Sequence, residues 1–185
     1  ATMHPIPRDL EKTKIESQEF FCALGKFFND QNIHIFITSP NSDNGKEIII
    51  QEINKLLKKE KKINYIESLG GHKYQTLMSL ANERKVIICG NSSSIIKEAP
   101  YFKAHSLNVG IRQNGREFAD SQINCEANMD AIYKSLKMII SKEISISFNP
   151  YYLPDSSERI VNFIFDSFKK YSREKILNKK WNEFL

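Results

Sequence analysis

The sequence predicts an α/β fold with three layers, a parallel sheet covered by helices on both faces. Two observations lead to this prediction. Short runs rich in β-branched residues, such as NIHIFIT at residues 32–38 and VIIC at residues 86–89, are typical of strands buried on both faces. Longer segments with apolar side chains at helical spacing separate these runs, and strands that alternate with helices form parallel sheets.

The elements follow in a regular order. Helices are expected over residues 10–30, 46–61, 74–82, 129–141 and 156–171, with one more short helix after the serines at 92–94. Strands are expected over residues 32–38, 63–66, 86–89, 106–109 and 123–126, and residues 2–4 resemble the end of another strand. Ligands bind beyond the carboxyl ends of such strands, so the informative loops are residues 4–9, 39–45, 69–71, 90–94 and 110–115.

Two parts are expected in the 185-residue chain. Residues 1–171 should form one Rossmann-like domain that ends with an amphipathic helix. Residues 172–185 should form a C-terminal helix, in which Ile176, Leu177, Trp181 and Phe184 are apolar. The first residue is not Met, and we expect the chain to begin partway through a larger protein.

The composition excludes several classes of function. A formal net charge of +5 suits an anionic ligand, but the charge is too scattered to indicate nucleic-acid binding. Cys22, Cys89 and Cys125 form no CxxC pair, so free thiols in a reducing compartment are expected. The four histidines have no metal-ligand spacing, and no metal or cofactor is expected. Without a long apolar run or a signal peptide, the prediction is a cytoplasmic protein away from membranes.

The loop GNSSS at residues 90–94 carries the clearest chemical signal. Gly90 lets the backbone turn sharply off a strand, and the first turn of the next helix leaves N–H groups without partners. Hydroxyls of Ser92, Ser93 and Ser94 add hydrogen-bond donors, and such helix entrances bind phosphate. The alternative is that one serine simply caps the helix.

Charged residues follow in the next helix and loop. Glu98 lies one to two turns into the helix, where a carboxylate accepts both hydroxyls of a ribose, although a surface glutamate is the common alternative. In GIRQNGR, residues 110–116, glycines bracket Arg112, Gln113 and Arg116. Arginines in such a loop suit bidentate recognition of an anion, and ordinary surface arginines are the alternative.

Two polar residues follow the first strands. His4 comes directly after residues 2–3 and could donate to a diphosphate oxygen or act as an acid or base, while a structural role is the alternative. Asn41, in SPNSDNG, could contact a base or phosphate, and a turn residue is the alternative.

These loops, in this order, resemble the C-terminal half of the hydrolysing UDP-N-acetylglucosamine 2-epimerases, which act in sialic and nonulosonic acid biosynthesis. The resemblance runs from TMHP to NPYYLPDSSERIVNFI, and its most specific pieces are GNSSS followed by KEAP, then NVGIRQNGR. It implies the C-terminal half of a GT-B architecture (the UDP-glycosyltransferase/glycogen phosphorylase type), with two Rossmann-like domains facing across a cleft. One departure is Ile95, where the family usually has Gly.

The resemblance also implies roles for residues. The residues implied to bind UDP are Asn41, Ser92, Ser93, Glu98 and Arg112, with Ser94, Gln113 and Arg116 as additional anion contacts. Ser92 and Ser93 would hold the diphosphate and Glu98 the ribose hydroxyls. His4 would be the catalytic candidate, while the base that removes the C2 proton would belong to the absent half.

The implied activity is conversion of UDP-N-acetylglucosamine and water to N-acetylmannosamine and UDP, by elimination of UDP followed by hydration. The implied partners are UDP, a UDP-N-acetylhexosamine, an N-terminal Rossmann-like domain of the same enzyme and further copies in a homo-oligomer. Residues 172–185 would pack on the N-terminal domain or a partner. Alternatives are a hydrolysing epimerase for a bacillosamine-type UDP sugar in legionaminic acid synthesis, a non-catalytic nucleotide-binding module, or a GT-B glycosyltransferase. This chain alone is expected to bind UDP without turnover.

Overall fold

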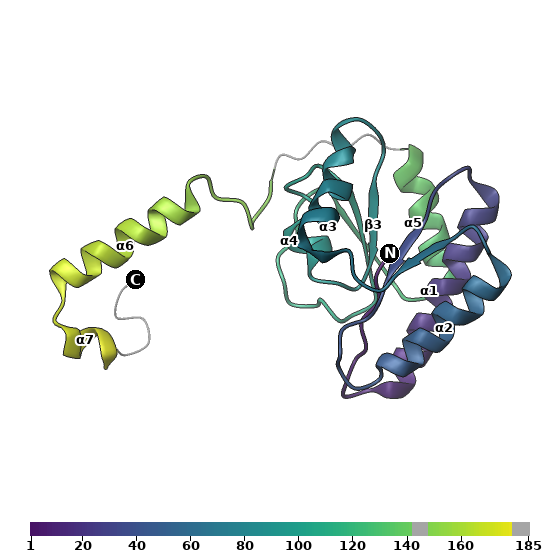
Figure 1. The fold of residues 1–185 in the computed structure, drawn as a ribbon, viewed down its shortest axis with the longest axis horizontal. Helices are drawn as coiled ribbons and strands as arrows, with labels where there is room; N and C mark the ends of the chain where they lie inside the picture. The colour runs from purple at the N-terminus through teal and green to yellow at the C-terminus, as the bar shows by residue number, and fades with distance from the viewer. Residues whose placement is uncertain (142–147, 179–185) are drawn as a thin grey trace. The chain divides into compact units, whose positions relative to one another are not determined.

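The structure is a computed structural model of the chain and describes residues 1–141 and 148–178 (Figure 1). Its contacts divide the chain into two compact units, Ala1–Pro150 and Tyr151–Leu185. This division falls before helix α6 (Ser156–Lys170), whereas the sequence analysis placed a boundary after residue 171. Helix α6 is grouped apart from the first unit because none of its residues is buried, so it does not contribute to the core of that unit.

The strands of the first unit are all parallel. Strand β1 (Phe36–Thr38) pairs with β2 (Asn64–Ile66). Strands β3 (Ile87–Gly90), β4 (His105–Val109) and β5 (Gln122–Cys125) pair in that order in a second sheet. The predicted parallel α/β architecture is therefore confirmed.

The N-terminal residues connect the two sheets. The amino group of Ala1 donates a hydrogen bond to the carbonyl of Phe36 (2.8 Å), and the N–H of Thr2 donates to the carbonyl of Cys89 (2.9 Å). The spatial order is therefore β2, β1, residues 1–3, β3, β4, β5. In this doubly wound order the chain changes direction between residues 1–3 and β3, and ligands bind at such a switch point.

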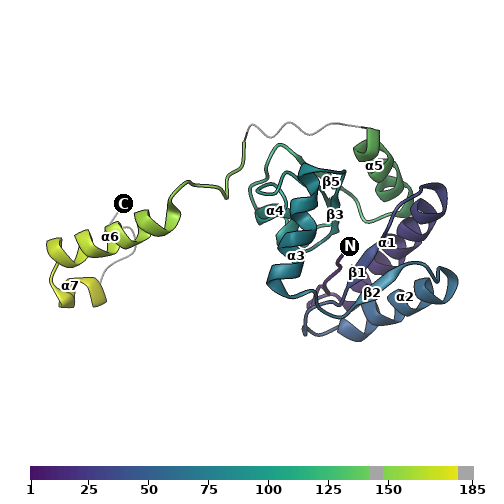
Figure 2. The ribbon, with the colours of Figure 1, turned by 45° about the horizontal axis from the view of Figure 1, so that its top comes forward.

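Helices cover both faces of these strands (Figures 1 and 2). Helices α1 (Leu10–Asp30), α2 (Lys46–Lys59) and α5 (Met129–Ser141) pack together on one face. Helices α3 (Gly70–Ser79) and α4 (Ser94–Lys97) lie on the other face. The buried core on the first face includes Phe20, Leu24, Ile37, Ile53, Leu107 and Ile132. A smaller core on the second face contains Met78, Ile88, Ile95, Ala99 and Ala104.

Element boundaries follow local capping and strand pairing. Helix α1 begins where predicted, because the side chain of Asp9 accepts a hydrogen bond from the N–H of Lys12 (2.8 Å). The strand expected over residues 32–38 is shorter, since β1 extends only as far as its pairing with β2. Helix α3 begins before the predicted residue 74, and a 3-10 turn, Leu80–Asn82, completes the predicted segment.

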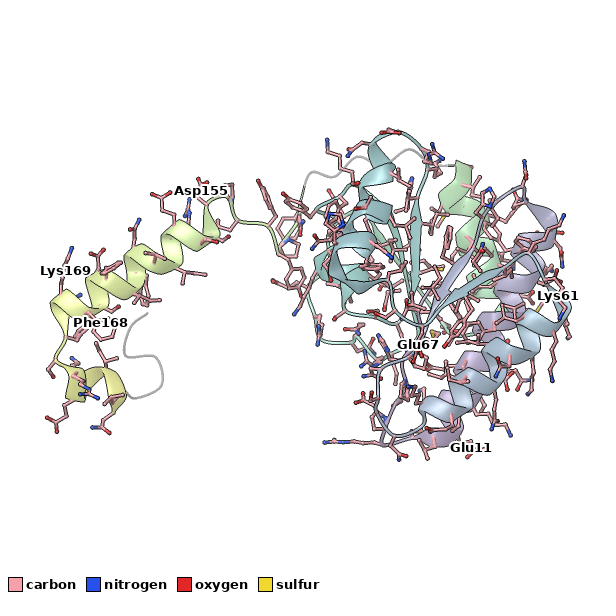
Figure 3. The ribbon with its side chains drawn as sticks, viewed as in Figure 1. Glu11, Lys61, Glu67, Asp155, Phe168 and Lys169 are labelled. Atoms are coloured by element: carbon pink, nitrogen blue, oxygen red, sulfur yellow. The ribbon has the colours of Figure 1, made fainter. Side chains whose placement is uncertain are left out.

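The second unit consists of α6 and α7 (Arg173–Leu177) in its described part. Ser172 caps α7 by accepting a hydrogen bond from the N–H of Lys175 (3.2 Å). The apolar side chains of α6 are exposed, including Phe168, which Figure 3 labels. Trp181 and Phe184, expected on the C-terminal helix, lie outside the described residues. No helix in residues 1–141 or 148–178 is long and apolar enough to cross a membrane.

Candidate functional site

The loop after β3 starts at a glycine that no other residue can replace without rearrangement. Gly90 has φ 131°, and a Cβ at this position would lie 1.8 Å from the carbonyl oxygen of Thr2. The next residue, Asn91, donates its backbone N–H to the same oxygen (3.2 Å). The close approach of these two backbones places the loop 90–94 beside His4, at the switch point of the sheet.

Asn91 holds His4 in place through its side chain. The backbone N–H of His4 donates to Oδ1 of Asn91 (2.6 Å), and Nδ2 of Asn91 donates to the carbonyl of His4 (2.9 Å). Asn91 is fully buried, so these hydrogen bonds are shielded from water. No role was predicted for this asparagine from the sequence, although Gly-Asn at the end of a strand indicates hydrogen bonding between the side chain and nearby backbone.

The carbonyl of Asn91 also holds the arginine loop. It accepts hydrogen bonds from NH1 of Arg112 (3.2 Å) and from Nε2 of Gln113 (2.7 Å). Gln113 is only 1% exposed, which favours a structural role for it over an anion contact. Arg112 remains partly exposed, and its NH2 lies 3.9 Å from Oδ2 of Asp43. Three chain segments predicted to carry site residues therefore meet at Asn91.

His4 is neutral at pH 7. Its pKa is lowered to about 4, mainly by burial and also by the positive charge of Arg112, while Asp43 opposes the shift. The N–H of Asn41 donates to Nδ1 of His4 (3.0 Å), so the single proton of the neutral ring resides on Nε2. His4 can therefore donate an Nε2–H hydrogen bond to an anion without carrying a charge.

In the loop 39–45, Asn41 and Asp43 contact each other as well as His4 and Arg112. Nδ2 of Asn41 donates to Oδ2 of Asp43 (2.6 Å), which also faces Arg112. The Oδ1 atom of Asn41 is buried and has no hydrogen-bond partner. Asn41 thus keeps one acceptor without a partner among the described residues, while its backbone N–H and one N–H of Nδ2 are engaged. Asp43 was missed by the sequence analysis, because nothing local distinguishes it from a turn residue.

The helix that follows the serine loop is too short to act as a phosphate-binding helix N-terminus by its dipole alone. Helix α4 is a single turn, so its dipole is small, and any phosphate contacts would come from hydroxyls and free amides. Within the described chain, the backbone N–H groups of Ser92 and Ser93 have no hydrogen-bond partner. The hydroxyl of Ser94 is buried and engaged, because it pairs with the hydroxyl of Tyr74 (2.8 Å) and donates to Oγ of Ser92 (3.1 Å).

Two further polar side chains, those of Tyr74 and Glu98, lie near the serine loop. Glu98 caps the end of α4, and its carboxylate is close enough to Tyr74 to act on its pKa. Burial raises the pKa of Tyr74, the hydrogen bond with Ser94 lowers it, and Glu98 raises it. Tyr74 was assigned only to a helix by the sequence analysis, because an aromatic residue in a helical pattern gives no separate signal.

The remaining candidates have different surroundings. Ile95, which replaces the glycine usual in the family that the sequence resembles, is fully buried in the smaller core. Arg116 is exposed, and its side chain makes no hydrogen bond with the described residues. Burial lowers the pKa of the Arg112 guanidinium, Asp43 raises it and Arg116 lowers it.

Among residues 1–141 and 148–178, no three His, Cys, Asp or Glu side chains come together to hold a metal.

A doubly wound parallel sheet with polar loops at its switch point defines a class of α/β domains that bind ligands at this edge. The family profile described as UDP-N-acetylglucosamine 2-epimerase matches residues 1–165. The chain belongs to this family.

Two relatives with curated names are similar to the chain over most of its length. It is 35% identical over 140 residues to the GDP/UDP-N,N'-diacetylbacillosamine 2-epimerase (hydrolyzing) of Campylobacter jejuni, a match covering 74% of this chain and 34% of the relative. The chain is also 33% identical over 140 residues to the UDP-N,N'-diacetylbacillosamine 2-epimerase (hydrolyzing) of Legionella pneumophila. This match covers 75% of this chain and 34% of the relative. The chain thus spans about a third of the length of these relatives.

The fold is shared with a solved structure. The UDP-GlcNAc 2-epimerase of Methanocaldococcus jannaschii, in complex with UDP-GlcNAc and UDP, superposes with a TM-score of 0.68 at 18% identity. The match covers 89% of this chain and 44% of that one. The GT-B-like α/β fold expected from the sequence is therefore confirmed.

Proposed function

We propose that this chain is the UDP-binding, C-terminal part of a hydrolysing UDP-sugar 2-epimerase. The observation that carries the proposal is the meeting of His4 and Arg112 at Asn91, directly before Ser92. A neutral N–H donor, a guanidinium and two unpaired backbone amides are thereby presented at the switch point of the sheet. This set of donors suits a diphosphate, which needs several hydrogen bonds and positive charge.

The nucleoside would lie on the other side of the serine loop. Glu98 can accept the two hydroxyls of a ribose, and its place at the end of α4 puts it beyond the serines that would hold phosphate. Tyr74 offers a ring near the same carboxylate, where a base could pack against it. Membership of the family and the M. jannaschii structure, which holds UDP, support uridine as the nucleoside.

The proposed reaction divides between two halves of the enzyme. A base in the absent half removes the C2 proton, the C2–H electrons form the C1=C2 bond, and the C1–O bond breaks to release UDP. Water then adds across the double bond, with hydroxyl at C1 and a proton on the opposite face of C2. His4, Arg112 and the loop of Ser92 and Ser93 stabilise the negative charge that develops on the leaving diphosphate.

A second candidate substrate is UDP-N,N'-diacetylbacillosamine, and a specific observation favours it over UDP-N-acetylglucosamine. The Campylobacter and Legionella relatives, at 35% and 33% identity, are named for this sugar. A UDP-N-acetylglucosamine 2-epimerase from Neisseria meningitidis is 28% identical. Comparing kcat/KM for the two UDP sugars with the full-length protein decides between them.

Calorimetry with UDP on this chain tests the nucleotide site. Ser93→Ala and Glu98→Ala should each weaken UDP binding by about ten- to a hundredfold, because each removes a hydrogen bond that involves a charged group. The matched controls are Ser157→Ala in α6 and the exposed Glu83→Ala, which should bind as wild type does. Unchanged affinity in both site variants would remove the proposed site.

Assays of turnover test the division of labour. The chain alone should bind UDP but release none from UDP-N-acetylglucosamine, and adding a separately produced N-terminal half should restore activity. Release at ordinary enzymatic rates by this chain alone would contradict the proposal. Failure to restore activity with the other half, despite UDP binding, would favour a nucleotide-binding module without chemistry. Sedimentation of the full-length enzyme would show whether it is the homo-oligomer that we expect.

A further inference from the structure

A pocket of about 700 Å³ opens at the same edge of the sheet and is lined by residues other than those proposed to bind UDP. Its walls come from the first two turns of α1, from the loop after β4, and from the end of β5 with the residues that follow it. The lining residues are Asp9, Glu11, Lys12, Ile15, Glu16, Gly110, Ile111, Asn114, Asn124, Cys125, Glu126 and Ala127. None of them is a residue that we assign to UDP.

The central group of this pocket is the carboxylate of Glu16. Its side chain is almost wholly buried, with the residue only 5% exposed, and Oε2 has no hydrogen-bond partner. The carboxylate lies against Gly110, where a Cβ would be 2.6 Å from Oε2. Gly110 has φ 73°, so the loop both requires a glycine and leaves room for the acid. A buried carboxylate without a donor is costly, which points to an absent partner.

The charged residues around Glu16 indicate which charge its missing partner would carry. Asp9, Glu11 and Glu126 also line the pocket, whereas Lys12 is the only basic residue among the described residues that line it. Glu11 lies at the start of α1 (Figure 3). Burial raises the pKa of Glu16, Lys12 lowers it and Asp9 raises it. With Glu16, four acidic residues and one basic residue line the pocket, which leaves an excess of negative charge in a chain whose net charge is +5. A neutral donor would satisfy Oε2 but would leave this excess uncompensated.

We propose that this pocket binds a small organic ammonium ion, with Glu16 as the carboxylate that pairs with its charged nitrogen. The apolar side chains of Ile15 and Ile111, both about half exposed, would cover the carbon atoms of the ligand. Asn114 and Asn124 provide amide groups for further hydrogen bonds. A metal ion fits less well, since the described residues bring no three acidic, His or Cys ligands together.

The test is a titration of the 185-residue chain by two-dimensional ¹H–¹⁵N NMR at constant ionic strength, with butylammonium chloride as the probe. The amide signals of Gly110, Ile111 and Ala127 should shift and saturate. 1-Butanol, which has the same chain without the charge, should produce no saturable shift, and KCl and MgCl₂ should produce none. Because none of these residues is among those that we assign to UDP, the result is independent of the proposed nucleotide site.

Variants assign the binding to the carboxylate. Glu16→Gln keeps the shape of the side chain and should weaken butylammonium binding at least about tenfold. Glu126→Gln, at a lining residue that follows β5, should weaken it by a smaller factor. Glu47→Gln is the matched control, since Glu47 is exposed on α2 and outside the pocket, and it should bind as wild type does.

Several outcomes would overturn the proposal. They are the absence of saturation by about 50 mM butylammonium, equal affinity in wild type and Glu16→Gln, and equal saturation by 1-butanol or the inorganic salts. If Glu16→Gln loses the native amide spectrum, Glu126→Gln and Ile111→Asn decide. Weaker binding in either of these variants supports the site, and unchanged binding in both overturns it.

Discussion

The side chain of Asn91 and the backbone of His4, 87 residues apart in the chain, form a reciprocal pair of hydrogen bonds. The pair joins the end of the N-terminal strand segment to the loop after β3, across the switch point of the sheet. Since the carbonyl of Asn91 also accepts from Arg112 and Gln113, one buried residue sets the positions of three loops.

Replacing Asn91 should therefore destabilise the fold as well as the site. Asn91→Ala removes two buried hydrogen bonds and leaves the N–H and carbonyl of His4 without partners, a loss of about 2–4 kcal/mol. Urea unfolding at 25 °C measures it. Asn44→Ala, an exposed residue of the loop 39–45, should change stability by no more than about 0.5 kcal/mol. Equal stability of the two variants would contradict a structural role for Asn91.

The pKa of His4 should depend on its charged neighbours. Arg112→Gln removes a positive charge that lowers this pKa, so the value should rise from about 4, while burial keeps it below the ordinary 6.5. Asp43→Asn should shift the pKa in the opposite direction. NMR titration of the His4 ring protons measures both shifts, with the exposed Arg84→Gln as the control. A wild-type pKa near 6.5 would show that the ring is not held neutral.

Two glycines should respond in opposite ways to the same substitution. Gly90→Ala places a Cβ 1.8 Å from the carbonyl oxygen of Thr2 at a φ of 131°, and we expect the variant not to fold to a native state. Gly71→Ala, in the first turn of α3, meets no atom within 4 Å and should stabilise the chain by about 0.5–1 kcal/mol. Circular dichroism melting separates the outcomes, and a stable Gly90→Ala chain would contradict the backbone contact.

Stability should decrease with acid over the range set by two histidines. Burial lowers the pKa values of His4 and His105 to about 4, with Arg112 adding to the shift at His4 and Lys85 at His105. The unfolded chain binds more protons between pH 6.5 and 4, so the free energy of unfolding rises with pH over this window. His105→Gln should reduce the loss of stability between pH 7 and 4.5, measured as the urea midpoint. An unchanged slope would show that His105 does not titrate as inferred.

Local patterns predicted the elements of the first unit well, because each depends on neighbouring residues. Helix α1 occupies the predicted residues 10–30, with Asp9 as its cap. Every predicted strand is present within a few residues of its expected place, and all pairs are parallel. Strand lengths were predicted less accurately: β1 begins at Phe36, where its pairing with β2 begins, rather than at residue 32.

The loops that contain the candidate site could also be named from sequence, but not the contacts within them. His4 and Arg112 were selected individually, and their meeting at Asn91 depends on strands that lie far apart in the chain. Ser94 was predicted to be an additional anion contact, whereas its hydroxyl is buried against Tyr74. The burial of Glu16 could not be predicted from the sequence, because a glutamate in an amphipathic helix is usually exposed.

The sequence by itself determined the alternation of strands and helices, the loops in which polar residues gather, and the resemblance to an epimerase family. Those properties depend on short-range periodicity and on residue types at close spacing. The tertiary structure alone decided that the N-terminal residues lie at the centre of the sheet, that His4 is held neutral, and that Glu16 lies buried against Gly110. Burial and electrostatic effects arise from residues brought together by the whole fold, so no local pattern contains them.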